Sequence, residues 1–326
     1  MIYTITLNPA VDHTLVLEDF APGMTNRVLE SRTDPGGKGV NVSRVLRELG
    51  DDSIAMGFVS GSLGRFIEHK LTQLGIQNEF IHTRGETRTN ITILDKRHHV
   101  MTPIHDMGPT TNLSYLEELN TRLDTRVQPG DWVMIGGSIP PPITHHQVYR
   151  DLVTRMKERG AYTILDADGD ALKAGLEAVP YMVKPNRFEL GQALHKDMSS
   201  EAAILKAAEQ LHQQGVAIVI ITASEQGAYG LNEEGAWRAV PPMVEKVSGV
   251  GAGDAFLAGA LHVLSAGGSL QEALRLGTAA GSATVRNPGT ELCHRREIER
   301  LVDRVVVFPV EHSHKGRAHL APARRS

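Results

Sequence analysis

The sequence predicts an α/β fold with a mostly parallel central sheet that helices cover on both faces. Three observations support this prediction. Short apolar runs alternate along the chain with longer segments of helical periodicity. Several of the helical segments end at a glycine, which is a common C-terminal stop of a helix. Strands that alternate with helices are typical of parallel sheets, because each crossover helix returns the chain to the same edge.

The first strand–helix unit sets the pattern. The run 2–7 ("IYTITL") reads as a strand, and the segment 40–50 follows it with Val42, Val45 and Leu49 on one helical face and Gly50 as the expected stop. Further units repeat this order. The predicted strands and their helices are 55–59 with 64–75, 131–137 with 144–160, 161–168 with 170–178, 181–186 with 187–194, and 216–224, which follows the helix 201–215.

Two stretches depart from the alternation, namely residues 14–32 and 87–101. Both have the mixed polarity of extended segments, and "DKRHH" (95–99) is a plausible turn between two strands. We expect a small β-lid at the edge of the sheet, built from segments of about 12–34 and 86–103; ordinary edge strands are the alternative. One domain is expected over 1–310. The polar, basic tail 311–326 lacks apolar periodicity and is predicted to be disordered.

Composition excludes several classes of protein. The formal net charge of −4 over 326 residues gives no basic footprint for nucleic acid. No apolar run approaches the roughly 18 residues that a membrane-spanning helix needs, so no membrane partner is expected. The only cysteine is Cys293, which excludes an intrachain disulfide, and the N-terminus lacks the features of a signal peptide. A cytoplasmic enzyme that acts on small molecules is the simplest expectation.

The segment 247–261 ("VSGVGAGDAFLAGAL") places glycines before one acid and then an apolar helix, expected at about 254–265. It matches neither the P-loop nor the G-x-G-x-x-G pattern. Glycine amides beside a helix N-terminus hold an anion. A carboxylate at Asp254 would repel a phosphate that is merely bound, but it suits a base that takes a proton from an alcohol while the amides hold the transferring phosphoryl group. The alternative is that Asp254 caps the helix.

A second glycine segment, "PGGKGVNV" (35–42), also stands directly before a helix. A tight turn explains its glycines but not the lysine inside it. The positive charge of Lys38 beside backbone donors suits a phosphate or a group of sugar hydroxyls.

Other polar clusters carry weaker predictions. The fifteen histidines include the pairs His98–His99 and His145–His146, but no H-E-x-x-H or Cys/His ligand spacing occurs, so we expect no zinc held by the protein. Asp166 lies at the end of a predicted strand, where ligands bind in parallel sheets. We interpret Asp166 as the cap of a loop; the alternative is that it contacts and orients residues that bind the ligand.

Together, the motifs "GGKGVN", "TRTN", "GSIP", "KPNRFE" and "GAGD" identify the chain, from Ile2 to about Val310, as similar to the ribokinase-like (PfkB-type) sugar kinases. The resemblance implies a three-layer ribokinase-like fold, with ATP and Mg²⁺ as cofactors. It also implies that Asp254 is the catalytic base and that the amides of Gly251, Ala252 and Gly253 form the anion hole. Gly249 and Ala255 depart from the Thr and Ser that are usual in the family.

The resemblance assigns a set of residues to the phosphoryl acceptor. Asp12 can accept hydrogen bonds from two sugar hydroxyls, and Arg88 can bind an existing phosphate of the acceptor in a fork geometry. The full acceptor set comprises Asp12, Gly36, Gly37, Lys38, Gly39, Asn41, Arg88, Asn90 and Ser138.

The resemblance also assigns the nucleotide side. Asn186 and Glu189 would organise Mg²⁺ and phosphates, largely through water and without direct ligation of the metal; by their spacing alone they are a helix cap, and both roles can coexist. Ser224 stands where the family has glycine, and Gly281 lies in a small-residue helix that would form a wall of the adenine pocket. The full nucleotide set comprises Lys184, Asn186, Glu189, Thr222, Ser224, Gly227 and Gly281.

The activity that the resemblance implies is ATP-dependent phosphorylation of a ketohexose monophosphate. The opening residues 1–20 and "GSIP" favour fructose 1-phosphate as the acceptor, with tagatose 6-phosphate and fructose 6-phosphate as alternatives. A sugar-phosphate sensor without catalysis, built on the same fold, is an alternative of another class. The family also suggests a homodimer that pairs through the β-lid, because isolated strand edges seek partners.

Overall fold

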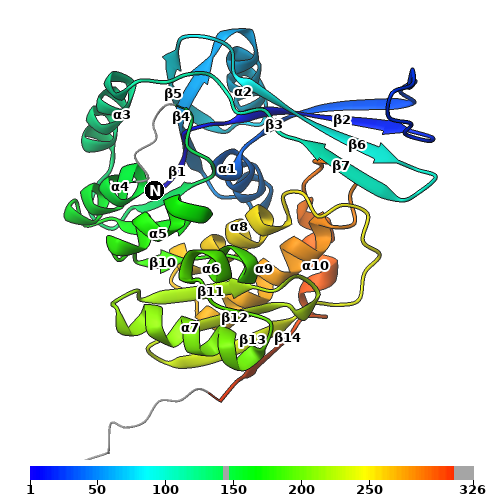
Figure 1. Cartoon of the computed structure of the whole chain (residues 1–326). Coiled ribbons are helices and arrows are strands. Elements are labelled where there is room, and N and C mark those ends of the chain that lie inside the picture. Colours follow the sequence, from blue (N-terminus) through cyan, green and yellow to red (C-terminus); the bar gives the residue numbers. More distant parts are fainter. Residues whose placement is uncertain (142–146, 312–326) are drawn as a thin grey trace, which may run out of the picture.

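A computed structural model of the chain describes residues 1–141 and 147–311, and it contains two sheets (Figure 1). The large sheet has ten strands in the order β14-β13-β12-β11-β10-β9-β8-β1-β4-β5. The strands from β5 to β11 in this order pair in parallel, and β12, β13 and β14 continue the sheet in antiparallel fashion. Their bounds are β1 Ile2–Thr6, β4 Ser53–Ser60, β5 Gln77–Thr83, β8 Trp132–Gly136, β9 Tyr162–Asp166, β10 Met182–Val183, β11 Ile218–Thr222, β12 Ala228–Asn232, β13 Gly235–Val240 and β14 Val306–Pro309.

Helices cover both faces of this sheet, which confirms the predicted layers. One apolar core lies between the sheet and α3 to α7, and a second lies between the sheet and α1, α8, α9 and α10. Strand side chains alternate between these two cores, as in β8, where Val133 enters the first and Met134 the second. The helices are α1 Lys38–Leu49, α2 Gly61–Gln73, α3 Leu113–Arg126, α4 Gln147–Glu158, α5 Gly169–Glu177, α6 Arg187–Leu194, α7 Glu201–Gln213, α8 Ala252–Ser265, α9 Leu270–Thr284 and α10 Arg295–Val302.

The second, small sheet has four strands in the order β3-β2-β6-β7 and projects away from the large sheet (Figure 1). Its strands are β2 Ala10–Leu17, β3 Glu30–Gly36, β6 Arg88–Asp95 and β7 Val100–Ile104. They overlap the two segments predicted for the lid and extend one or two residues beyond them at Ala10, Gly36 and Ile104; the turn predicted around 95–99 connects β6 to β7. Two predictions fall on residues that the structure does not describe. These are the disorder of the tail, from residue 312 onward, and the start of the helix predicted over 144–160.

Glycines bring α8 and α9 into close contact. A β-carbon on Gly259 would lie 3.0 Å from the α-carbon of Gly277, and one on Gly281 would lie 3.1 Å from the carbonyl oxygen of Ala252. Such distances leave no room for a side chain at these positions without a shift of the helices. This packing fixes the N-terminal end of α8, where the predicted anion hole begins.

Candidate active site

Several residues of the predicted acceptor and nucleotide sets, together with Asp166, gather at the carboxyl ends of the parallel strands. Asp166 ends β9, Lys184 follows β10, and Ser138 follows β8. The small sheet contributes Asp12 from β2 and Asn90 from β6. The remaining groups come from the first turns of α1 and α8, so one edge of the large sheet unites segments that lie far apart in the sequence.

Asp254 lies in the first turn of α8 with its carboxylate buried. The N-cap of this helix is Gly251, whose φ of 75° belongs to the left-handed region that favours glycine. The Asp254 carboxylate makes no cap; its Oδ2 accepts a hydrogen bond of 2.8 Å from the Asn41 side-chain amide. Burial, together with the charge of Asp166, raises the pKa of Asp254 to about 6, although Lys38 opposes this shift. A carboxylate with such a pKa is ionised at neutral pH and is well suited to accept a proton.

Two lysines face the fully buried carboxylate of Asp166. Lys38 Nζ lies 2.8 Å from Oδ1, and Lys184 Nζ lies 3.0 Å from Oδ2. Burial alone would raise the pKa of Asp166, but these two cations outweigh it and lower that pKa. Asp166 is therefore not the loop cap that the sequence favoured; the N-cap of α5 is Asp168. Its position at the end of a strand was the signal in the sequence that pointed to the site.

Lys38 links the two halves of the site. Besides Asp166, its ammonium contacts Glu189 Oε1 of α6 at 3.4 Å. Burial alone would lower the pKa of Lys38, but the carboxylates of Asp166, Glu189 and Asp254 outweigh it and raise that pKa above its usual range. Lys38 therefore keeps its positive charge at the centre of the site.

Asp12 and Asn90, both predicted to bind the acceptor, are hydrogen-bonded to each other. Asn90 Nδ2 donates to Asp12 Oδ1 at 2.9 Å, and Asn90 Oδ1 is buried with no hydrogen-bond partner among the described residues. Burial raises the pKa of Asp12, against the opposing effects of Asn90 and Arg44. A β-carbon on Gly36 would overlap the Asp12 carboxylate, so a larger residue at this position would displace that carboxylate.

The other glycines of "GGKG" let the turn pack closely on β1. A β-carbon on Gly37 would lie 2.8 Å from Thr6 Cγ2, and one on Gly39 would lie 2.5 Å from Thr6 Oγ1. Nearby, the guanidinium of Arg88 donates to the carbonyl oxygen of Asn8 and, at 2.9 Å, to Ser138 Oγ. The structure thus brings together Arg88 and Ser138, two residues of the predicted acceptor set.

On the predicted nucleotide side, Asn186 and Glu189 form a complete capping box at the start of α6. Asn186 Oδ1 accepts hydrogen bonds from the backbone of Phe188 and Glu189, and Glu189 Oε2 accepts one from the Asn186 backbone. Thr222 pairs with Asn186 in an isolated parallel bridge, so the end of β11 lies beside this cap. The cap leaves Glu189 Oε1 facing Lys38.

The turn after β11 carries Ser224 and Gly227. Ser224 has a φ of 51°, so this serine takes a left-handed conformation at a position where the family has glycine. Gly227 has a φ of 91°, and a β-carbon there would overlap the carbonyl oxygen of Ala239.

The sequence model of the pfkB family carbohydrate kinases matches residues 5–296 of the chain. The chain belongs to the pfkB family of carbohydrate kinases. The chain is 36% identical over 288 residues to 1-phosphofructokinase of Bacillus subtilis, a match that covers 87% of this chain and 92% of that protein. It is 33% identical over 313 residues to tagatose-6-phosphate kinase of Staphylococcus epidermidis, with 95% and 100% covered.

Solved structures agree with this assignment. Phosphofructokinase-2 of Escherichia coli in complex with potassium superposes with a TM-score of 0.88 at 28% identity and covers 93% of this chain and 98% of its own. The prediction of a ribokinase-like fold is confirmed. Within the described part of this kinase, no helix combines the length and apolar character needed to cross a membrane.

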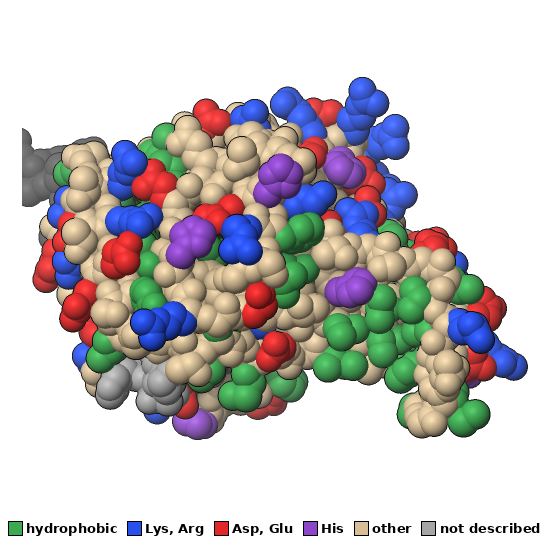
Figure 2. Space-filling model, turned by 90° about the horizontal axis from the view of Figure 1, so that it is seen from above, with side chains coloured by type: hydrophobic (Ala, Val, Ile, Leu, Met, Phe, Trp, Pro, Cys, Tyr) green, Lys and Arg blue, Asp and Glu red, His purple; other side chains and the backbone are tan. Residues whose placement is uncertain are grey.

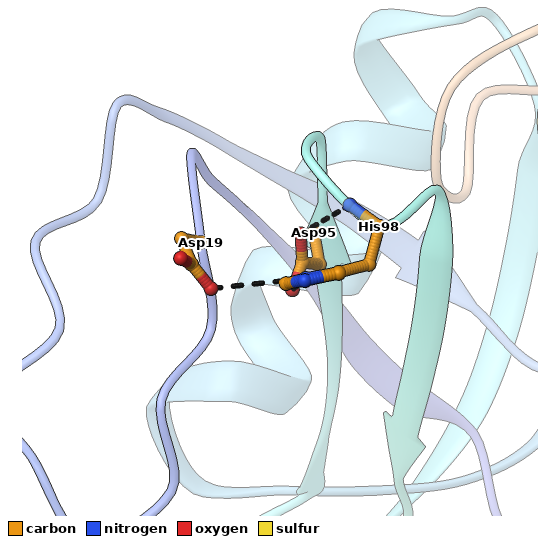
Figure 3. Close-up of side chains that lie close together, drawn as sticks. All are labelled: Asp19, Asp95 and His98. Atoms are coloured by element: carbon orange, nitrogen blue, oxygen red, sulfur yellow. Dashed lines mark hydrogen bonds and ion pairs between the residues drawn. The ribbon is translucent and has the colours of Figure 1, made fainter.

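A cluster of Asp19, Asp95 and His98 lies at the far end of the small sheet (Figure 3). Its groups are engaged with one another and with the backbone: Asp95 accepts hydrogen bonds from the backbone of Phe20 and His98 and lies 2.9 Å from His98 Nδ1. These contacts connect the β6–β7 turn to the segment that follows β2, which includes Asp19 and Phe20. The cluster thus has the contacts of a capped turn. The other histidine pair noted in the sequence, His145–His146, lies outside the described residues.

Proposed function

We propose that this kinase transfers a phosphoryl group from ATP to fructose 1-phosphate and forms fructose 1,6-bisphosphate. The observation that carries the proposal is the environment of Asp254. Its buried carboxylate has a pKa of about 6, lies in the first turn of a helix whose N-cap is Gly251, and accepts a hydrogen bond from Asn41 of the acceptor segment. This is the arrangement that a general base for an alcohol needs.

In the proposed reaction, Asp254 takes the proton of the attacking sugar hydroxyl. The oxygen so formed attacks the γ-phosphorus, and the bond from that phosphorus to the bridging oxygen breaks, with ADP as the leaving group. The amides of Gly251, Ala252 and Gly253 hold the charge on the transferring group. Lys38 adds a fixed positive charge on the acceptor side.

Asp12 and Asn90 support the sugar in this proposal. The unpartnered Oδ1 of Asn90 is a buried acceptor that a sugar hydroxyl would satisfy, and leaving such an atom unpaired is costly. Arg88 donates to Ser138 and to the carbonyl oxygens of Asn8 and Asp106, and we infer that it binds the phosphate already present on the acceptor. Gly36, Gly37, Gly39 and Asn41 complete the acceptor set.

For the nucleotide, the donor set fits a magnesium ion held through water. Carboxylate and amide oxygens are the ligands that Mg²⁺ prefers, and Asn186 and Glu189 provide them. Both side chains are already engaged in the capping box, which fits contact through water rather than direct ligation. Bound there, the ion would neutralise charge on the phosphates. Lys184, Thr222, Ser224, Gly227 and Gly281 complete the proposed nucleotide site.

The choice of acceptor rests on the relatives, which include both a 1-phosphofructokinase and a tagatose-6-phosphate kinase. The test is ADP release from Mg·ATP with fructose 1-phosphate, tagatose 6-phosphate, fructose 6-phosphate and fructose in parallel. A higher kcat/KM for fructose 1-phosphate supports the proposal, and preference for a 6-phosphate moves the substrate but keeps the mechanism. A folded protein that binds a sugar phosphate in calorimetry, but neither binds nor cleaves ATP, would be the sensor.

We also propose a cytoplasmic homodimer that pairs through the small sheet. Apolar side chains on and beside its strands are about half exposed, namely Val28 46%, Leu29 54%, Val100 52% and Ile104 50%. Figure 2 shows hydrophobic side chains gathered on the projecting part of the molecule. Strand edges and apolar surface of this kind favour pairing. Sedimentation at several concentrations tests it, and Val100→Glu with Ile104→Glu is expected to give monomers.

A further inference from the structure

Arg44 is a buried cation next to the acceptor segment that no motif singled out. It lies on α1, one turn after Asn41, with 12% of its side chain exposed. Its Nη1 donates to the carbonyl oxygen of Pro35 at 2.8 Å and contacts Asn41 Oδ1 at 3.3 Å, and its Nη2 contacts Asp34 Oδ1 at 3.4 Å. Burial lowers the pKa of Arg44, yet an arginine side chain stays charged in proteins.

These contacts leave the Asn41 amide one favourable orientation. Its oxygen faces the guanidinium, and its Nδ2 donates to Asp254 Oδ2 at 2.8 Å. If the amide turned over, its NH₂ group would face the N–H donors of Arg44 and its oxygen would face a carboxylate. Both hydrogen bonds would then be lost within a buried site, where unpaired polar groups are costly.

Arg44 is itself held in place from the small sheet. Its partner Asp34 accepts a hydrogen bond of 2.7 Å from Arg32 Nε and one of 3.0 Å from Thr290 Oγ1. Because Asp34 and the Pro35 carbonyl lie at the end of β3, the guanidinium connects the base of this sheet to the Asn41 amide. The connection runs from β3 through Arg44 and Asn41 to the carboxylate of Asp254.

We propose that Arg44 is a positioning residue for phosphoryl transfer, which fixes the Asn41 amide so that its N–H group faces the carboxylate of Asp254. The inference rests on the proposed function, because it takes Asp254 as the base. Without Arg44 the amide is free to turn, and the ionised carboxylate loses a donor. The other charged groups around Asp254 are Asp166 on β9, Lys38 on α1 and Lys184 after β10, and these stay unchanged.

The test compares Arg44→Met with the unchanged kinase in pH profiles of kcat/KM, using the sugar phosphate preferred in the substrate panel. We expect kcat to fall about tenfold. The acid limb of the profile, where kcat/KM falls as the base becomes protonated, should move to higher pH by about half a unit, because the ionised base loses a hydrogen bond. The KM for ATP should change less than about twofold. Arg47→Met, which removes an exposed arginine one turn further along α1, is the matched control and should leave the limb in place.

Two further variants keep the test decisive. Arg44→Lys keeps the charge but not the fork of donors, so it should give a smaller shift, and it replaces Arg44→Met if that variant does not fold. If Arg44 acts through Asn41, then Arg44→Met should add little to the loss caused by Asn41→Ala. A lowered kcat with an unmoved acid limb, or additive losses, would overturn the inference. Near-normal turnover of Asp254→Asn would instead overturn the proposed base itself.

Discussion

The α-carbon of Gly36 stands so close to the carboxylate of Asp12 that a single added methyl group would overlap it. Gly36 has no left-handed φ, so Gly36→Ala introduces only this clash. We predict that Gly36→Ala displaces Asp12 and raises the KM for the sugar phosphate at least about tenfold, because at least one charged hydrogen bond is lost. Steady-state kinetics measures this. Gly130→Ala, where a β-carbon meets nothing within 4 Å, should leave that KM unchanged, although the φ of 87° at this position lowers the stability of the alanine variant.

Replacement of Asp254 by asparagine separates binding from chemistry. Asp254→Asn removes the proton acceptor and keeps the shape, so turnover should fall by about 10²- to 10⁴-fold. Calorimetry should still detect the sugar phosphate, because Asp12, Asn90 and Arg88 are untouched. Turnover within a few-fold of the unchanged kinase would remove Asp254 as the base.

The same variant should also be more stable at neutral and alkaline pH. The pKa of Asp254 in the folded state, about 6, lies above its ordinary value, so ionisation of this group opposes folding. The penalty is absent below about pH 4 and fully present above about pH 6. Urea unfolding should therefore show a gain of about 1–3 kcal/mol for Asp254→Asn at pH 8, and no gain near pH 4. A variant that is less stable at pH 8 would contradict the raised pKa.

The raised pKa also predicts the pH dependence of the reaction. A base works only when ionised, so kcat/KM should be level above about pH 7, half its maximum near pH 6, and should fall about tenfold per pH unit below about pH 5. Initial rates in overlapping buffers from pH 5 to 9 measure this limb. A limb near pH 4 would mean that the site is more open to solvent than the burial of Asp254 implies.

Asp166 neutralises the buried Lys184 and the partly exposed Lys38, and its loss should be costly for stability. Asp166→Asn leaves Lys38 and Lys184 without their shared counter-charge, so we expect the free energy of unfolding to fall by about 3–5 kcal/mol. Asp52→Asn breaks an ion pair in which 72% of the carboxylate side chain is exposed, and it should change stability by less than about 1 kcal/mol. Denaturant unfolding of both variants provides the comparison.

Ser224 offers a stabilising change. The φ of Ser224 is 51°, which brings its β-carbon close to its own backbone; a glycine at this position would remove that contact. Ser224→Gly should gain about 0.5–1 kcal/mol, after the larger entropy of glycine in the unfolded chain is counted. Ser224→Ala keeps the β-carbon and should gain nothing. Thermal unfolding distinguishes the two.

The sequence predicted those parts whose cause is local. Most of the parallel strands are buried on both faces and therefore read as apolar runs, whereas β5, which is partly exposed at the edge of the sheet, was not predicted. Gly50 stops α1 with a φ of 99° as expected. The antiparallel strands β12, β13 and β14 were not predicted, and neither was α3, which buries only Leu119 and Leu123 among its residues. Partial burial of α3, β13 and β14 leaves little periodicity to detect, and the buried β12 is a short strand with Gly230 at its centre.

The site divides in the same way. Glycines before a helix are a local signal, and they pointed to Asp254 and to Lys38. The roles of Asp166 and Arg44 depend on partners in other elements: Lys38 and Asp166 are 128 residues apart in the chain. Only the fold brings such pairs together, and a buried carboxylate between two lysines has no local pattern.

The contact between Asn41 and Asp254, which joins residues 213 positions apart, has a consequence for the synthesis of the protein. The groups proposed to hold the sugar, such as Asp12, Gly36 and Asn90, emerge early from the ribosome, and the first strand made, β1, lies between β8 and β4 in the finished sheet. The carboxylate of Asp254, the proposed base, emerges much later. A nascent chain can therefore begin to shape its acceptor side, but it cannot consume ATP until most of its length has been translated.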